Sequence, residues 1–252
     1  MASKNRGQFV WHEYLARDVQ AAVAFYTETI GWKTQPFGDD YVMWVGTQGP
    51  LGGVFRAPGE QPHKPLWIGH VQVDDVDTTA ARASKLGGRV WKEPTDIPTV
   101  GRFAVLADPQ GAPISVFKPA GEMGLHDLSR QGEFSWNELL TSDSAAALRF
   151  HSELFGWQVL DEMDMGPMGT YRIFGIGAQR LGGMINTPKR EAIAPTWMYY
   201  VNTTDVDAAL GRATTRGAKV LSGPMEVPGG GRIVQLLDPQ GAAIALHQGP
   251  AD

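Results

Sequence analysis

The spacing of hydrophobic positions changes in a fixed order at the start of the chain. Across residues 9–15, bulky apolar side chains alternate with others, which is the pattern of a strand with two different faces. Across residues 19–30 they recur every three or four positions, which predicts a helix with Asp18 as its N-cap and Gly31 just beyond its end. Three short strands bounded by Gly, Asp and Pro are predicted next, at residues 32–37, 41–46 and 51–56.

The same order of one strand, one helix and three strands returns further along the chain. Residues 67–73 alternate like a strand, and residues 75–86 have a helical spacing that closes on Gly87-Gly88. Strands are predicted at residues 89–93, 102–107 and 113–118, and the second half repeats the series with helices at residues 142–155 and 206–216. These patterns predict an α+β fold built of four βαβββ modules.

The amino-acid sequence itself repeats once. Residues 9–14 (FVWHEY) match residues 134–139 (FSWNEL) at a spacing of 125, and residues 108–112 (DPQGA) recur as residues 238–242 at a spacing of 130. Solenoid repeats have periods of roughly 20–50 residues, so a repeat of this length indicates a duplicated domain. We therefore expect a first domain at residues 1–118, a polar linker with three glycines at residues 119–132, and a second domain at residues 133–252.

Composition narrows the classes of partner. The 252 residues carry a net charge of −5 with scattered Lys and Arg, so we expect no nucleic-acid partner. There are no cysteines, which excludes thiol catalysis and Cys-rich metal sites. No apolar run reaches the roughly 18 residues of a membrane span, and the first six residues lack the apolar stretch of a signal peptide. We expect a cytoplasmic protein without a membrane partner.

Three short motifs recur in both halves in the same order. They are Ala24-Phe25-Tyr26 followed by Gly31-Trp32, the pair Gly52-Gly53, and Asp108-Pro109-Gln110-Gly111; the second half has Arg149-Phe150-His151 with Gly156-Trp157, Gly182-Gly183, and Asp238-Pro239-Gln240-Gly241. In this order the motifs resemble those of the vicinal oxygen chelate superfamily, which includes glyoxalase I, bleomycin-resistance proteins and extradiol dioxygenases. The most similar branch is that of the tandem-domain, CFP-30B-like proteins. The resemblance implies two tandem domains, in each of which two modules curl their sheets around a small-molecule cavity.

The resemblance also says where a metal ion would bind. Enzymes of the superfamily hold one divalent ion, such as Zn, Ni, Fe or Mn, with His and Glu side chains from the first and last strands of paired modules. In this chain the corresponding positions carry residues that are poor ligands: Trp11, Ile68, Ser115, Trp136, Met198 and Ala245. We therefore expect no metal and no other cofactor.

Residues on the same strand faces as these positions supply the candidate chemistry, because side chains two positions apart point the same way. The candidate catalytic groups are Glu13, Glu138 and His247. The candidate ligand-binding groups are Trp11, His70, Ser115, Phe117, Trp136 and Tyr200. By strand parity, the first cavity is expected to hold Glu13 and His70, and the second Glu138, Tyr200 and His247.

Structural interpretations of the same residues stay open. Glu13 and Glu138 recur in both halves, so a role in the shared scaffold competes with catalysis. His70 and His247 do not correspond to each other, which favours a ligand-specific role, since a scaffold role would recur.

Two arginines also recur, and we expect them to be structural. Arg102 and Arg232 each follow a glycine at the start of a third strand. They are predicted to form ion pairs with Asp108 and Asp238, the first residues of the DPQG motifs.

The leading hypothesis is a small-molecule-binding protein of the glyoxalase/bleomycin-resistance type, which holds an aromatic or apolar ligand without the usual metal. One enzymatic alternative is a metal-dependent lyase, isomerase or dioxygenase with a divalent ion held by residues among Glu13, His70, Glu138 and His247. Another is metal-free acid–base chemistry by Glu138 with Tyr200 or His247. A third alternative is an interaction protein with vestigial cavities. We expect a monomer or a homodimer, since duplication supplies the module pairing within one chain.

Overall fold

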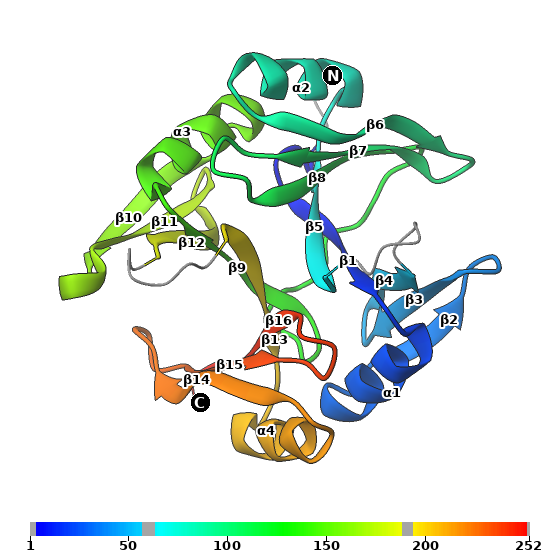
Figure 1. Cartoon of the computed structure of the whole chain (residues 1–252), viewed down its shortest axis with the longest axis vertical. Coiled ribbons are helices and arrows are strands. Elements are labelled where there is room, and N and C mark those ends of the chain that lie inside the picture. Colours follow the sequence, from blue (N-terminus) through cyan, green and yellow to red (C-terminus); the bar gives the residue numbers. More distant parts are fainter. Residues whose placement is uncertain (1–3, 57–63, 188–193, 251–252) are drawn as a thin grey trace. The chain divides into compact units, whose positions relative to one another are not determined.

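Within residues 4–56, 64–187 and 194–250, which the computed structural model describes, the chain forms four α-helices and sixteen strands. They follow one another as four modules of strand, helix and three strands (Figure 1), which confirms the predicted α+β fold. The first module comprises β1 (Phe9–Ala16), α1 (Val19–Thr29), β2 (Lys33–Pro36), β3 (Tyr41–Gly46) and β4 (Gly49–Arg56). The second comprises β5 (Leu66–Gln72), α2 (Val76–Lys85), β6 (Arg89–Ile97), β7 (Gly101–Ala107) and β8 (Pro113–Pro119).

The second half of the sequence repeats this series. The third module comprises β9 (Phe134–Thr141), α3 (Ser144–Phe155), β10 (Gln158–Asp164), β11 (Thr170–Ile176) and β12 (Gln179–Asn186), with one 3-10 turn at Gly166–Met168. The fourth comprises β13 (Thr196–Asn202), α4 (Val206–Thr215), β14 (Lys219–Glu226), β15 (Arg232–Leu237) and β16 (Ala243–Gln248). None of the helices in the described part of the chain combines the length and the apolarity that crossing a membrane requires.

The strands form two eight-stranded sheets, one from each half of the sequence. Their orders are β2-β3-β4-β1-β5-β8-β7-β6 and β10-β11-β12-β9-β13-β16-β15-β14. In every module the last strand runs parallel to the first and the other pairs are antiparallel. A parallel pair needs a crossover connection, and the helix of each module supplies it and covers one face of that module's strands (Figure 1).

Each helix begins at an aspartate. The side chain of Asp18 accepts a hydrogen bond from the amide of Ala21 at 3.0 Å, and Asp75, Asp143 and Asp205 cap the other three helices in the same way. These contacts satisfy amide groups that have no partner within the helix. Gly31 and Gly156 follow the ends of α1 and α3 with φ of +92° and +79°, a left-handed conformation that favours glycine. The predicted N-cap at Asp18 and the predicted glycine stop are confirmed.

The chain divides into two compact units that combine modules from both halves of the sequence. One unit contains Met1–Trp11, Ile68–Leu125 and Asn137–Trp197, and the other contains His12–Trp67, His126–Trp136 and Met198–Asp252. Helices α2 and α3 pack together in the first unit, and α1 and α4 in the second. The limits of the two tandem domains expected from the repeat, 1–118 and 133–252, remain a prediction.

A buried hydrogen-bond chain joins the first and fourth modules in the second unit. Tyr26 on α1 donates from Oη to Asp238 Oδ2 at 2.9 Å and accepts from Trp67 Nε1 at 2.8 Å. The other oxygen of Asp238 accepts the amides of Gln240 and Ala242 in its own turn. Burial, together with the charge of Asp238, raises the pKa of Tyr26 well above its ordinary value, so its hydroxyl stays a donor.

His151 takes the place of Tyr26 in the first unit. Its ring stacks on Trp157 at 5.4 Å and meets Trp197 edge-on at 5.6 Å, as Tyr26 stacks on Trp32 at 5.8 Å and meets Trp67 edge-on at 5.2 Å. Nδ1 of His151 bonds the carbonyl of Ala147 at 2.8 Å, and burial lowers the pKa of the ring to about 4. Its Nε2 has no hydrogen-bond partner among the described residues.

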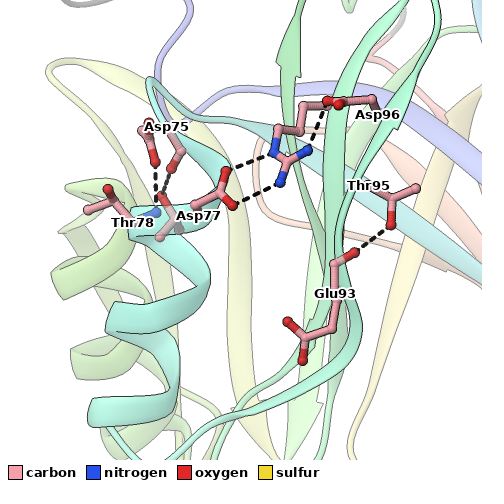
Figure 2. Close-up of polar contacts among 8 residues, drawn as sticks. Asp75, Asp77, Thr78, Glu93, Thr95 and Asp96 are labelled. Atoms are coloured by element: carbon pink, nitrogen blue, oxygen red, sulfur yellow. Dashed lines mark hydrogen bonds and ion pairs between the residues drawn. The ribbon is translucent and has the colours of Figure 1, made fainter.

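The predicted partners of the two recurring arginines are wrong, although the ion pairs exist. Arg102 donates to both oxygens of Asp77, at 2.7 and 2.8 Å, and to Asp96 at 2.9 Å (Figure 2). Arg232 donates in the same way to Asp207 at 2.6 and 3.1 Å. Arg102 and Asp108 stand at opposite ends of β7, about 20 Å apart along an extended strand. The helix terminus beside Arg102 supplies the nearer carboxylate.

Candidate functional site

The predicted site residues lie on the first and last strands of their modules, as the sequence pattern indicated. Trp11 and Glu13 are on β1, His70 on β5, Ser115 and Phe117 on β8, Trp136 and Glu138 on β9, Tyr200 on β13, and His247 on β16. In the parallel ladders His70 stands opposite Ser115, and Tyr200 opposite Ala245. Residues opposite each other in a ladder share a face of the sheet, but that they line a ligand site remains a prediction.

A tyrosine holds the candidate glutamate in both halves of the chain. Tyr41 on β3 donates from Oη to Glu13 Oε1 at 2.8 Å. Tyr171 on β11 donates from Oη to Glu138 Oε2 at 3.1 Å. Glu138 is buried and the other three side chains are half-buried, so the contacts are partly shielded from water. Each hydroxyl donates to one oxygen of its carboxylate and thereby helps to orient it.

The glycine pairs of the sequence motif make room for these contacts. A side chain at Gly52 would place Cβ 2.1 Å from the carbonyl oxygen of His12, and one at Gly182 would place it 1.9 Å from that of Asn137. At the second glycine the obstacle is the tyrosine. Cβ at Gly53 would lie 2.2 Å from the hydroxyl of Tyr41, and Gly183 stands in the same relation to Tyr171 at 2.1 Å. The first glycine of each pair lets two strands meet, and the second lets the tyrosine ring reach the glutamate.

Sequence reasoning did not single out Tyr41 and Tyr171. The signal was present, because the two tyrosines are separated by 130 residues, the same spacing as the DPQG motifs and the glycine pairs. Period-2 patterning could place them on a strand, but it could not show that they face Glu13 and Glu138 from a strand two places away in the sheet order.

The candidate residues of the second module lie close together in the first unit. Ser115 is fully buried, and its hydroxyl donates to the carbonyl of Ala104 on β7 at 3.0 Å. The ring of Phe117 meets that of His70 edge-on at 6.3 Å, and Phe103 lies at the same centroid distance from His70. His70 is thus set among aromatic rings, while the hydroxyl of Ser115 serves the strand pairing.

The candidate residues of the fourth module form a polar group in the second unit. His247 Nδ1 lies 3.0 Å from Ser135 Oγ, and Ser135 Oγ lies 3.3 Å from the carbonyl oxygen of Tyr200. The hydroxyl of Tyr200 accepts a hydrogen bond from Gln235 at 2.7 Å. Burial lowers the pKa of His247, so its ring is neutral near pH 7.

The two expected cavity groupings draw on residues of different units. Glu13 belongs to the second unit and His70 to the first, and Glu138 belongs to the first unit while His247 belongs to the second. Trp11 and Trp136 are half-buried, one in each unit. These groupings remain predictions.

The residues present do not fit the metal site of the superfamily. Among the described residues, no group of three or more His, Asp or Glu side chains is arranged to hold an ion. Of the four side chains proposed for a relocated site, Glu13 and Glu138 each have one oxygen occupied by a tyrosine hydroxyl. His247 Nδ1 is hydrogen-bonded to Ser135, which is compatible with ligation through Nε2, so the relocated site remains a prediction.

One open depression lies away from all of these residues. It has a volume of about 580 Å³ and is lined by the start of α1 and the neighbouring ends of β3 and β4, including Arg17, Asp18, Asp40 and Arg56. Its charges are of both signs and largely compensate one another. None of the predicted site residues lines it.

With the fold and the site in place, comparison with known proteins defines the family. Residues 133–246 match the family described as Glyoxalase/Bleomycin resistance protein/Dioxygenase superfamily, and residues 10–117 match the family described as Glyoxalase-like domain. The two matches fall on the two halves of the repeat. The chain therefore belongs to the glyoxalase/bleomycin resistance/dioxygenase superfamily as a tandem of two such domains.

Relatives of similar length cover almost the whole chain. One relative is CFP32 of Mycobacterium tuberculosis (strain CDC 1551 / Oshkosh), a protein named as a glyoxylase by inference. It is 29% identical to this chain over 94% of this chain and 92% of its own length. The anthracycline biosynthesis protein DnrV of Streptomyces peucetius is 29% identical over 95% of this chain and 92% of its own.

Solved structures share the fold at low sequence identity. The Mn(II)-bound glyoxalase of Novosphingobium aromaticivorans has a TM-score of 0.68 at 15% identity and covers 98% of this chain and 83% of its own. The 2,2',3-trihydroxybiphenyl 1,2-dioxygenase of Sphingomonas wittichii strain RW1 has a TM-score of 0.70 at 14% identity, covering 97% of this chain and 91% of its own. At such identities the likeness concerns the fold alone.

Proposed function

We propose that the protein binds a small aromatic or apolar molecule in its sheet-lined cavities, and that it does so without the metal ion of the superfamily. The observation that carries the proposal is the duplicated Tyr–Glu pair, Tyr41 with Glu13 and Tyr171 with Glu138. In each half, the carboxylate nearest to a family ligand position is engaged by a phenol hydroxyl. A few oriented polar groups beside aromatic side chains are typical of small-molecule sites.

Aromatic residues support the class of ligand. By the sequence pattern, Trp11 and Trp136 correspond to the first-strand metal ligands of the superfamily, and both side chains are half-buried. The trihydroxybiphenyl dioxygenase named above acts on an aromatic compound, and DnrV takes part in the biosynthesis of anthracyclines. We propose further that the protein acts as a monomer or homodimer in the cytoplasm, with no nucleic-acid or membrane partner.

The proposal is tested on protein purified without added metal. Elemental analysis is expected to find far less than one divalent ion per chain. A panel of small aromatic compounds is expected to raise the melting temperature in proportion to the logarithm of ligand concentration, because binding to the folded state alone stabilises it. Stoichiometric Zn, Ni, Fe or Mn, or a panel without any effect, would count against the proposal.

A metal-free acid–base enzyme is the second candidate, and Tyr171 favours it. Glu138 is buried beside a hydroxyl that can pass or receive a proton, which is the arrangement of a general base with its positioning group. Glu138→Gln separates the two functions once a ligand is known. Loss of turnover with unchanged affinity would favour the enzyme, and unchanged turnover would remove Glu138 from any chemistry. Tyr171→Phe is the matched control for the hydrogen bond alone.

A further inference from the structure

The second half of the chain carries a hydrogen-bonded pair that the first half lacks. Ser135 and His247 lie 3.0 Å apart at Oγ and Nδ1. At the corresponding positions of the first half, 125 and 130 residues earlier, the chain has Val10 and Phe117. The first half thus has two apolar residues at these positions, whereas the second half has two polar residues that are hydrogen-bonded to each other. Because the first half builds the same strands without them, the fold does not require the polar pair.

The hydrogen bonds of Ser135 decide which nitrogen of His247 carries the proton. The carbonyl oxygen of Tyr200 lies 3.3 Å from Ser135 Oγ and can only accept, so it receives the single hydroxyl proton. Ser135 Oγ then accepts from His247 Nδ1–H. In a neutral imidazole the other nitrogen is unprotonated, so Nε2 presents a lone pair. This is the less usual tautomer of a free histidine, and Ser135 is what selects it.

A glycine lies beside the Nε2 edge of the ring. A Cβ at Gly231 would lie 3.0 Å from His247 Nε2. In the first half a Cβ at Gly101 would lie 2.7 and 2.8 Å from two ring carbons of Phe117. The two rings therefore occupy equivalent positions over equivalent glycines, and the replacement of Phe by His puts an acceptor where the first half has a carbon. Within the described residues, Nε2 of the half-buried His247 makes no hydrogen bond.

An aromatic residue stands on the strand next to that of His247. Tyr200 is buried on the neighbouring strand, with its hydroxyl already accepting from Gln235 at 2.7 Å. A group bound at Nε2 has to donate a hydrogen bond, and a neutral donor on an aromatic ring suits these neighbours best.

We propose that Ser135 and His247 form a recognition site in the second half of the chain for the hydroxyl of a phenolic ligand, which donates a hydrogen bond to His247 Nε2. The site deepens the proposed function and rests on it. It also makes the two halves unequal: the first half offers only Phe117 at this place, and the second offers a fixed acceptor held by Ser135.

Two probes that differ only in the donor test the site on the full chain. They are 2-naphthol and 2-methoxynaphthalene, whose ether oxygen cannot donate. By isothermal titration, the natural protein is expected to bind 2-naphthol about ten-fold more tightly than its methyl ether. The double variant Ser135→Val/His247→Phe restores the residues of the first half, and it is expected to bind both probes with nearly equal affinity. Gly231→Ala leaves the pair intact but crowds Nε2, and it is expected to reduce the preference as well.

The outcomes separate this site from the proposed function. Equal affinity of the natural protein for both probes, or a preference that the double variant keeps, overturns the site while small-molecule binding stands. Failure of both probes to bind counts against the proposed function, and the tautomer then decides the site by itself. Nitrogen-15 NMR of His247 is expected to find the proton on Nδ1, and to find it moved toward Nε2 in Ser135→Val. A proton on Nε2 of the natural protein overturns the proposal.

Discussion

At the scale of single residues, the duplication works as a comparison within one chain. Tyr26 and His151 hold corresponding positions and pack against corresponding tryptophans, but only Tyr26 reaches an aspartate. The imidazole ring is smaller than the phenol ring and lacks its hydroxyl group, so the His151 side chain does not extend as far as that of Tyr26. Within the described residues, the buried atoms without a hydrogen-bond partner include Nε2 of His151 and Oδ2 of Asp108, the counterpart of Asp238. A buried polar atom without a partner costs about 1–3 kcal/mol, so His151 is a less favourable residue at its position than Tyr26 is at the corresponding one.

His151→Tyr is therefore expected to stabilise the protein. Because Tyr26 donates to Asp238, the new hydroxyl is expected to donate to Asp108, which corresponds to Asp238 in the repeat. We expect the free energy of unfolding to rise by about 1 kcal/mol, which raises the melting temperature by about 2–4 °C. Tyr26→Phe is the opposite change, because it removes the partner of Asp238 and Trp67, and should lower the stability by about 2 kcal/mol. Differential scanning calorimetry measures both, and a destabilised His151→Tyr protein would contradict the comparison.

The charged pairs on the surface belong to the same scale but matter less. Arg102 bonds Asp77 and Asp96, and Arg232 bonds Asp207. The aspartates are exposed, with relative accessibilities of 60, 75 and 60% for their side chains, so water and salt screen each pair. The ion pairs recur because both halves share an architecture in which the start of a strand lies beside the start of a helix. They are not expected to contribute much to stability.

At the scale of elements, the glycine pairs couple the strand ladder to the candidate site. The first glycine of each pair faces a backbone carbonyl of the neighbouring parallel strand, and that carbonyl cannot move without breaking the ladder. The second glycine faces the far end of a tyrosine side chain, which can rotate away. Two adjacent residues of one type thus serve different purposes, and they should respond differently to the same substitution.

Gly182→Ala and Gly183→Ala test this difference. Gly182→Ala forces β12 away from Asn137 on β9 and is expected to cost more than about 3 kcal/mol, at the upper end of single substitutions. Gly183→Ala is expected to cost less, because Tyr171 can swing aside, but it breaks the bond to Glu138. Urea denaturation gives the two stabilities, and aromatic NMR signals of Tyr171 report its displacement. Equal losses for both variants would contradict this account of the motif.

At the scale of the whole molecule, contacts between residues far apart in the sequence hold each compact unit. In the second unit, Gln240 bonds the backbone of Arg17 and Asp18 across more than 220 residues, and Arg212 bonds the carbonyl of Thr29 across 183. In the first unit, Trp157 donates to the carbonyl of Gly7 across 150 residues. The second unit therefore needs both ends of the chain before it can form, and contacts at such separation are typical of slow folding.

The stability of the whole protein should depend on pH through His151. Its pKa of about 4 in the folded state lies below the ordinary value of 6.5, so only the unfolded chain takes up the proton between these values. The contribution of neutral His151 to the free energy of unfolding is therefore fully present above about pH 6.5. The free energy of unfolding then falls by about 3 kcal/mol as the pH drops toward 4. Burial raises the pKa of Asp108, which works in the opposite direction near the acidic end of this range.

Urea denaturation at a series of pH values between 7 and 4 measures this loss. The His151→Tyr variant is the control, since it cannot take up the proton on unfolding. The stability difference between the variant and the natural protein should widen steadily as the pH falls through the range. Parallel curves would show that His151 is not the titrating group.

The sequence alone determined the modules of this protein. Helix and strand periodicity, the aspartate caps and the glycine stops are local properties, and the duplication fixed the family and the strands that carry the candidate residues. The sequence could also place Glu13, Glu138 and His247 on strand faces, because side chains alternate between the two faces of a strand whatever its neighbours are.

Only the tertiary structure decided which groups meet. Tyr41 and Glu13 are 28 residues apart, and Ser135 and His247 are 112 apart, so their contacts depend on the register and order of strands that local patterns leave free. The partners of Arg102, and the joining of modules from opposite halves into one compact unit, were hidden for the same reason. Periodicity records how each segment faces its own core, whereas a site is made where distant segments come together.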